Sequence, residues 1–161
     1  MDSTEHIRMR LTMRYHSRLR EILIRTLLLA AVLATSLAKA ADDYTSPESI
    51  DGSVRIDANE LITLADKYDA LVIIDARVQS DRKQGFIPGS INLPDTKTDC
   101  ASLAGVMPSK HSEVVFYCNG PKCKRSYHAV AIAVACGYNR VFWFRGGIEE
   151  WLHKDYPIQK K

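Results

Sequence analysis

The segment VVFYCNGPKCKRSYHAVAIA, residues 114–133, decides the fold class of this chain. It begins with apolar, strand-forming residues, continues with a short polar and basic stretch, and ends with apolar residues at helical spacing. Cys118 lies directly after the predicted strand, and Arg125 opens the predicted helix. Functional sites in open α/β sheets form just beyond the carboxyl ends of strands. This order therefore predicts a strand, a functional loop and a helix.

Strands and helices alternate on both sides of this segment. We expect strands at residues 71–75, 113–117 and 141–144, a very short strand within 85–94, and helices at residues 58–67, 99–106, 125–136 and 148–152. Asp57 followed by Glu60 is typical of a capping box at a helix start, and Gly137 is typical of a helix end. The alternation predicts an α/β fold with a central parallel sheet flanked by helices on both faces.

The first 40 residues are typical of a secretory signal peptide. The stretch Met1–Arg25 contains six arginines, an apolar run follows from Leu27 to Leu37, and the sequence AKA at 38–40 matches a cleavage site. The apolar run is shorter than the roughly 20 residues of a membrane span, and the alternative is an uncleaved anchor that would contact the membrane. We expect an exported, periplasmic protein with a signal peptide at 1–40, a flexible lead-in at 41–52, one domain at 53–156 and a frayed tail at 157–161.

The predicted leader accounts for the apparent basicity of the chain. It holds seven of the 22 Lys and Arg residues and three of the 19 Asp and Glu residues, which leaves 15 basic against 16 acidic residues. This balance gives no support to a nucleic-acid partner. The remaining part holds all four cysteines, Cys100, Cys118, Cys123 and Cys136. In an oxidising compartment they allow three full pairings, and the sequence does not select among them.

The loop after the predicted strand suits a reactive thiolate. Backbone N–H groups in such a loop and the dipole of the following helix both favour an anion. Three cations close to Cys118 in the sequence add to this field, so we expect Cys118 to be ionised at neutral pH and to act as a nucleophile. The alternative is a buried structural cysteine. The predicted anion-binding loop consists of Asn119, Gly120, Pro121, Lys122, Cys123, Lys124 and Arg125.

Four motifs, taken together and in this order, resemble those of a single-domain rhodanese. They are DAR at 75–77, GFIPGSINLP at 85–94, the loop that begins at Cys118, and FRGGIEEW at 144–151. The resemblance extends over residues 54–151, nearly all of the predicted domain. It implies a rhodanese-like α/β fold and an enzyme that transfers sulfur.

The resemblance also implies a mechanism. Cys118 would attack the outer sulfur of a donor such as thiosulfate, release sulfite and hold the sulfur as a persulfide, or take it from a persulfide donor. A thiol or cyanide acceptor would then remove it. Such an enzyme needs no metal and no cofactor. Asp75 and Arg77 are then expected as a structural ion pair or loop anchor rather than as an acid–base pair.

Two positions depart from the family pattern. Phe86 replaces the usual histidine, and six residues rather than four separate Cys118 from Arg125, which places Cys123 inside the loop. Cys123 has three interpretations: a resolving thiol that attacks the persulfide and leaves an intraloop disulfide, an incidental loop cysteine, or a metal ligand with Cys118 and His128. The spacing C-x4-C without a second ligand pair makes a metal site the weakest of these.

The other two cysteines have two interpretations. Cys100 and Cys136 form a structural disulfide if the loop pair is reserved for chemistry, or Cys136 belongs to the apolar core. Trp143 and Trp151 are expected to be core aromatics.

Three alternative functions stand beside an exported sulfurtransferase. The first is a thiol–disulfide oxidoreductase that uses Cys118 and Cys123 with a redox protein partner. The second is a sulfur carrier that relays persulfide sulfur without turnover. The third, a phosphatase or arsenate reductase with a C-x5-R loop, fits poorly because Arg125 is the seventh residue after Cys118.

Overall fold

A parallel five-stranded sheet forms the centre of the structure. A computed structural model describes residues 44–160 of the 161-residue chain, so the predicted signal peptide lies outside the described residues. The strand order is β1-β5-β4-β2-β3, and all four strand pairings are parallel. The strands are β1 (Ser53–Ile56), β2 (Val72–Asp75), β3 (Ile91–Asn92), β4 (Val114–Tyr117) and β5 (Val141–Phe144).

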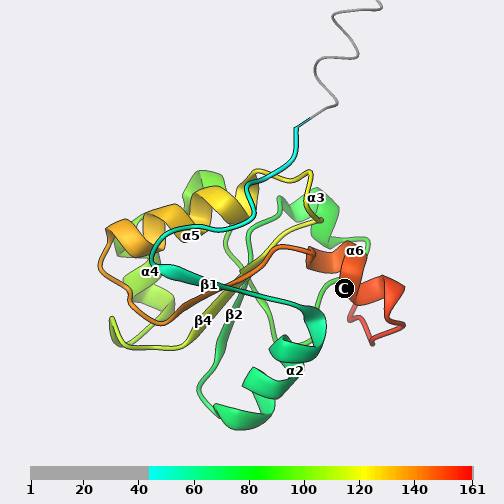
Figure 1. The fold of residues 1–161 in the computed structure, drawn as a ribbon, viewed down its shortest axis with the longest axis horizontal. Coiled ribbons are helices and arrows are strands. Elements are labelled where there is room, and N and C mark those ends of the chain that lie inside the picture. The colour runs from blue at the N-terminus through cyan, green and yellow to red at the C-terminus, as the bar shows by residue number, and fades with distance from the viewer. Residues whose placement is uncertain (1–43, 161) are drawn as a thin grey trace, which may run out of the picture. The chain divides into compact units, whose positions relative to one another are not determined.

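Helices cover both faces of this sheet, as predicted. They are α2 (Ala58–Lys67), α3 (Gln79–Arg82), α4 (Cys100–Val106), α5 (Arg125–Ala135) and α6 (Gly147–His153), with a 3-10 turn, η1, at Asp95–Lys97. Figure 1 shows α4 and α5 on one side of the strands and α2 and α6 on the other. The structure therefore confirms the predicted fold class.

Two apolar cores, one on each face of the sheet, hold the layers together. The core under α4 and α5 includes Ile74, Leu103, Phe116, Val130 and Trp143. The core under α2 and α6 includes Leu61, Ile87, Val115, Tyr117 and Trp151. Consecutive residues of β4 alternate between the two cores, and all four are buried. This double burial explains why β4 is an uninterrupted apolar run, and it fixes the position of the residue that follows it.

Local capping explains where several elements begin. The Asp57 side chain accepts from the Glu60 N–H and the Glu60 side chain accepts from the Asp57 N–H, which is the predicted capping box of α2. Asp99 and Ser102 make a second capping box at α4. Helix α5 ends just before Gly137. The φ of Gly137 is 86°, a conformation that glycine adopts easily and that strains other residues.

The sequence analysis missed β1 and α3. The strand β1 lies at the edge of the sheet, and only Ile56 of its four residues is buried. Such an edge strand lacks the apolar run by which the central strands are predicted. The helix α3 is a single turn of four polar residues, QSDR, and carries no apolar periodicity.

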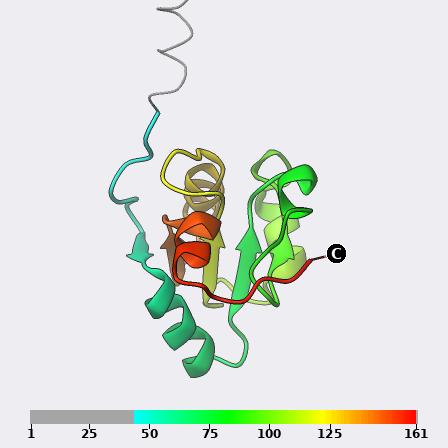
Figure 2. The same cartoon turned by 90° about the vertical axis from the view of Figure 1, so that its right-hand side faces the viewer.

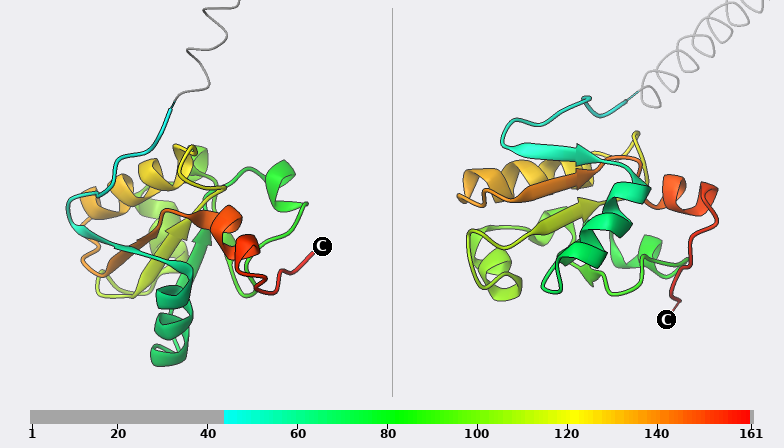
Figure 3. Two further views of the ribbon diagram at one scale, coloured as in Figure 1. Left: turned by 45° about the vertical axis from the view of Figure 1, so that its right-hand side comes forward. Right: turned by 60° about the horizontal axis from the view of Figure 1, so that its bottom comes forward.

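Residues 44–52 differ from the flexible lead-in that the sequence predicts. Ser46 is buried, and its N–H and hydroxyl both donate to the Pro121 carbonyl at 2.8 Å. The Arg145 guanidinium donates to the Ser46 carbonyl at 2.8 Å and to the Pro47 carbonyl at 2.9 Å. Figure 3 shows this segment, in cyan, crossing beside α5 before it enters β1. The buried Ser46 therefore anchors the segment to the domain, while most of its other residues are exposed.

The C-terminal segment also differs from the predicted frayed tail. Phe86 and Gln159 form an antiparallel bridge, with N–H to carbonyl distances of 3.0 and 2.9 Å. The Trp151 indole donates to the Pro157 carbonyl at 2.8 Å. In Figure 2 the red C-terminal segment runs beside the green segment that contains Phe86. The domain therefore extends past residue 156.

No helix among residues 44–160 has both the length and the apolar character needed to cross a bilayer.

Candidate active site

Cys118 lies at the carboxyl end of β4, directly against the first turn of α6. The Ile148 N–H donates to the Cys118 carbonyl and the Glu149 N–H to the Asn119 carbonyl, both at 2.9 Å. Gly147 has a φ of 59°, and a Cβ on it would lie 2.3 Å from the Cys118 carbonyl oxygen. Only glycine permits this approach, so the second glycine of the GG pair allows the loop to dock on α6.

A hydrogen-bond relay reaches the sulfur of Cys118 from the opposite side. The Ser126 hydroxyl donates to Cys118 Sγ at 3.3 Å, and the Trp143 indole N–H donates to Ser126 Oγ at 3.0 Å. A serine hydroxyl has one proton to donate. Because its oxygen accepts from Trp143, that proton is directed at the sulfur, where it favours a thiolate. Both Ser126 and Trp143 are buried.

The sequence analysis missed this relay. It assigned Trp143 to the core, where the ring does lie, and gave Ser126 no role of its own. The available signal was the position of Ser126, which directly follows Arg125 at the start of the predicted helix. The indole N–H gave a second signal, because a buried tryptophan usually needs a hydrogen-bond acceptor.

Cys118 and Cys123 form a disulfide within the loop, with Cα atoms 6.4 Å apart. A turn brings them together, because the Cys123 N–H donates to the Gly120 carbonyl at 2.9 Å. Cys118 is 1% exposed, whereas Cys123 is partly exposed. A second disulfide, Cys100–Cys136, joins the start of α4 to the end of α5, with Cα atoms 5.5 Å apart. Within residues 44–160 every cysteine is therefore paired.

A pocket of about 460 Å³ opens beside this loop. It is lined by Asp81, Asn119, Gly120, Lys122, Cys123, Lys124, Arg125 and Glu149. Six of the seven predicted loop residues are thus brought together around one opening. Pro121 is the exception, because it lines a neighbouring pocket with Arg145 and Glu150.

The charge around the pocket is mixed, because acidic residues join the three cations that the sequence analysis named. Arg125 donates to the Asp95 carboxylate at 2.9 Å, and the Lys124 ammonium lies 4.4 Å from the centre of the Tyr44 ring. Asp81 and Glu149 add two carboxylates that sequence reasoning did not place there. Acids far apart in the sequence reach the loop only through the folding of α3 and α6.

Backbone donors at the loop remain free for an anion. Helix α5 has no side-chain cap at Lys124, so the first N–H groups of this 11-residue helix face the loop uncapped. In the part of the chain that is described, the N–H groups of Gly120, Lys122 and Lys124 have no protein acceptor within hydrogen-bond distance. Gly120 is itself a buried residue. Unpaired buried N–H groups are rare, and an anion is one natural partner.

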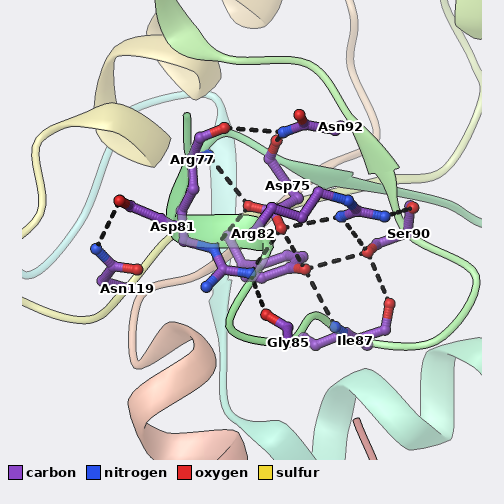
Figure 4. Close-up of polar contacts among 10 residues, drawn as sticks. Asp75, Arg77, Asp81, Arg82, Gly85, Ile87, Ser90, Asn92 and Asn119 are labelled. Atoms are coloured by element: carbon purple, nitrogen blue, oxygen red, sulfur yellow. Dashed lines mark hydrogen bonds and ion pairs between the residues drawn. The ribbon is translucent and has the colours of Figure 1, made fainter. Parts of the chain in front are cut away.

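A second polar cluster lies at the end of the neighbouring strand, around Asp75 (Figure 4). The guanidinium groups of Arg77 and Arg82 donate to the Asp75 carboxylate at 2.8 to 2.9 Å. The Tyr117 hydroxyl donates to it at 2.9 Å. Arg77 also donates to the Gly85 carbonyl at 2.8 Å, which ties the 85–94 loop to β2. Asp75 and Arg77 thus form the buried ion pair that the sequence analysis expected, with Arg82 as an additional partner.

Burial and the Asp75 charge set the ionisation of this cluster. Burial, together with the nearby Asp75 charge, raises the pKa of Tyr117 to about 12. Burial alone would lower the pKa of Arg77, but the hydrogen bond and charge of Asp75 leave it raised. Among the described residues no buried side-chain nitrogen or oxygen lacks a hydrogen-bond partner. The Asp75 cluster is a closed, fully paired network.

Phe86 has a packing role in this cluster. The Arg82 guanidinium lies 3.6 Å from the centre of its ring, within range of a cation–π contact. The residue that replaces the usual histidine therefore covers the buried arginine.

The described residues contain no group of three or more His, Cys, Asp or Glu side chains placed to hold a metal ion.

Comparison with known proteins identifies the domain. Residues 57–154 match the rhodanese-like domain family. A sulfurtransferase of Allochromatium vinosum is 37% identical over 98 residues, which cover 59% of this chain and 83% of the relative. The crystal structure of a Bacillus halodurans protein, 27% identical, has a TM-score of 0.58 over 66% of this chain and 77% of that chain.

A further solved structure supports the fold alone. The thiosulfate sulfurtransferase of Pseudomonas aeruginosa is 23% identical, with a TM-score of 0.59 over 67% of this chain and 20% of that chain. Together with the motifs at β2, β4 and α6, these matches assign the chain to a family. It belongs to the rhodanese-like domain family.

Proposed function

We propose that this protein is a sulfurtransferase that carries sulfane sulfur on Cys118. The observation that carries the proposal is the environment of that sulfur. Cys118 lies at the carboxyl end of β4, accepts a hydrogen bond from the Ser126 hydroxyl at 3.3 Å and begins a loop that contains unpaired N–H groups. Each of these features stabilises negative charge on a thiolate or on the persulfide that it forms.

The proposed reaction has two steps. The Cys118 thiolate attacks the outer sulfur of thiosulfate, the sulfur–sulfur bond of thiosulfate breaks, and sulfite leaves with the bonding electron pair. The outer sulfur of the Cys118 persulfide is then attacked by a thiolate or by cyanide, and the Cys118 thiolate is regenerated. A persulfide donor enters by the same route and leaves as its thiolate. The loop disulfide must be reduced before the first step.

The test is an intact mass measurement on the reduced full chain. After reductant is removed, thiosulfate is added to the wild type and to Cys118→Ser and Cys123→Ser. We expect Cys123→Ser to gain one sulfur atom, located on Cys118, and Cys118→Ser to gain none. Addition of cyanide should remove the sulfur as thiocyanate. Failure of reduced Cys123→Ser to gain sulfur from thiosulfate or from a low-molecular-weight persulfide would refute the proposal.

A second candidate function, thiol–disulfide exchange, is favoured by the loop disulfide. In that case the reduced wild type would oxidise to the loop disulfide while a substrate disulfide is reduced, and no sulfur atom would be transferred. Reduction of a dithiol-reactive chromogenic disulfide by the wild type, with no sulfur uptake by Cys123→Ser, would select this function.

We also propose that the protein is exported to the periplasm. The support is the basic and apolar order of residues 1–37 and the AKA sequence at 38–40. Mass analysis of the chain from a periplasmic extract should show Ala41 at the N-terminus. Recovery of the uncut chain in the membrane fraction would favour an anchor, and recovery in the cytosol would refute export.

A further inference from the structure

We propose that Cys123 is a second catalytic residue, which resolves the Cys118 persulfide and releases its outer sulfur as hydrogen sulfide. This inference rests on the proposed function, because it acts on the persulfide formed there. It adds a product, sulfide, and a co-substrate class, an external dithiol.

The conformation of the loop holds Cys123 next to Cys118. The Cys123 N–H closes a turn on the Gly120 carbonyl at 2.9 Å. The tip of the loop is held from outside, because the Ser46 N–H and hydroxyl both donate to the Pro121 carbonyl at 2.8 Å. The two loop sulfurs are bonded in the structure. Cys123 therefore reaches the inner sulfur of a Cys118 persulfide, which is Cys118 Sγ itself.

The reaction balances within the site. The Cys123 thiolate attacks Cys118 Sγ, the bond from Sγ to the outer sulfur breaks, and that sulfur leaves as hydrosulfide with the electron pair. The Cys118–Cys123 disulfide forms. The outer sulfur gains two electrons, and the two cysteine thiols supply them. One persulfide thus yields one sulfide and one loop disulfide.

A reductant should attack one particular sulfur of the loop disulfide. Cys118 is 1% exposed, whereas Cys123 is partly exposed and lines the 460 Å³ pocket. An external dithiol therefore attacks the Cys123 sulfur, and Cys118 leaves as a thiolate toward the Ser126 hydroxyl. A leaving thiolate that is stabilised in this way departs faster. The second thiol of the dithiol then frees Cys123, and the dithiol ends as a disulfide.

The net reaction follows from these steps. Thiosulfate and a dithiol give sulfite, hydrogen sulfide and a disulfide, with sulfur, hydrogen and electrons balanced. A monothiol or cyanide competes with Cys123 for the same persulfide, at its outer sulfur. The loop cysteine therefore directs sulfur to sulfide when a dithiol is the available reductant.

A single-turnover experiment on the full chain tests this inference. The chain is selectively reduced at the loop, freed of reductant and mixed with one equivalent of thiosulfate. Sulfite and sulfide are quantified and the intact mass is recorded. For the wild type we expect sulfite and sulfide in equal amounts and a chain two hydrogens lighter. For Cys123→Ser we expect sulfite, no sulfide and one retained sulfur atom.

The matched control is Cys100→Ser/Cys136→Ser, which removes the other disulfide and leaves the loop unchanged. It should release sulfide as the wild type does. If this double variant does not fold, peptide mapping of the wild type after the single turnover gives the same information, because the loop disulfide must form as sulfide appears.

The outcomes separate this inference from the proposed function. A stable persulfide on wild-type Cys118, or the outer sulfur found on Cys123, would overturn the resolving role and leave sulfur transfer intact. Sulfide release by Cys123→Ser at the wild-type rate would also overturn it. Absence of a persulfide on Cys123→Ser would overturn both.

Discussion

Two polar clusters lie at the carboxyl ends of neighbouring strands, and they differ in whether their hydrogen bonds are complete. The cluster at the end of β2 surrounds the Asp75 carboxylate with two guanidinium groups and the Tyr117 hydroxyl, all buried. The loop at the end of β4 begins at the buried Cys118, contains unpaired N–H groups and lines an open pocket. The paired cluster can only hold structure, whereas the unpaired one can receive a ligand.

The two clusters also share a boundary. Tyr117 is the last residue of β4, donates to Asp75 and directly precedes Cys118. The Arg77 guanidinium lies 5.6 Å from the centre of the Tyr117 ring. A buried ion-pair network therefore anchors the strand end from which the Cys118 loop departs. This arrangement suits a site whose thiol must stay aligned while the pocket beside it is open.

Removal of the sulfur should have the largest effect of any single change. We expect Cys118→Ser to lose cyanide-dependent turnover of thiosulfate completely, because no other cysteine lies at the end of β4. Under conditions that reduce the loop, its free energy of unfolding should stay close to that of the wild type. Turnover by Cys118→Ser above the rate measured without protein would contradict this prediction. It would show that sulfur transfer does not depend on the Cys118 loop.

Removal of the central charge of the paired cluster should act on stability instead. Asp75→Asn leaves two buried guanidinium groups without their carboxylate, and loss of one partner of a buried ion pair costs about 3–5 kcal/mol. Urea unfolding measures this loss. The control is Asp66→Asn, which changes an exposed carboxylate on α2 and should shift stability by less than about 0.5 kcal/mol. A small effect of Asp75→Asn would show that the network does not hold the strand ends.

Tyr117 should make stability fall at alkaline pH. Its pKa is raised to about 12 in the folded chain from 10.0, so its contribution is complete below pH 10 and is lost as the pH rises toward 12. A shift of this size corresponds to about 3 kcal/mol. Unfolding measured across this range should show a flatter decline for Tyr117→Phe than for the wild type. Parallel curves for the two proteins would argue against a buried neutral hydroxyl.

The hydrogen bond from the Ser126 hydroxyl should change the reactivity of the Cys118 thiolate, with a smaller effect than the changes above. In a Cys123→Ser background, we expect Ser126→Ala to raise the pH midpoint of Cys118 alkylation by about one unit, since a hydrogen bond to a charged group contributes about 1.5–3 kcal/mol. Ser126→Thr keeps a hydroxyl and should restore most of the midpoint. If the chains with alanine and with serine at position 126 have equal midpoints, Ser126 does not stabilise the Cys118 thiolate.

The carboxylates around the pocket should have the smallest effect. Glu149→Gln removes one negative charge beside the loop, so it should lower the KM for thiosulfate about two- to threefold, consistent with exposed charge pairs worth under about 1 kcal/mol. The effect should shrink at high salt. A KM that rises instead would mean that Glu149 helps to bind the donor.

Most of the fold could be predicted from the sequence, and the reasons are specific. The strands β2, β4 and β5 are buried apolar runs, and α2 carries its own capping box, so each had a local signal. The edge strand β1 had none, because one buried residue in four makes no pattern. The bonds of Ser46 and Gln159 join segments far apart in the sequence, which local composition does not reveal.

The candidate site was predicted in part for the same reason. Cys118 and its loop are contiguous in the sequence and could be found from it. Asp81, Glu149 and Trp143 approach the site from α3, α6 and β5, so their contributions depend on the packing of distant elements. The three cations near Cys118 in the sequence do line the pocket, and folding adds two acids that the sequence did not place there.

The central claim is that the unpaired cluster holds sulfur on Cys118. The most direct measurement is the mass of the tryptic peptide that contains Cys118, taken from reduced Cys123→Ser after one equivalent of a sulfane donor. The account predicts that this peptide is heavier by one sulfur atom, that cyanide removes this atom, and that the Asp66→Asn change has no influence on it. An unmodified peptide from a folded, fully reduced chain, with either thiosulfate or a persulfide as donor, would contradict the account.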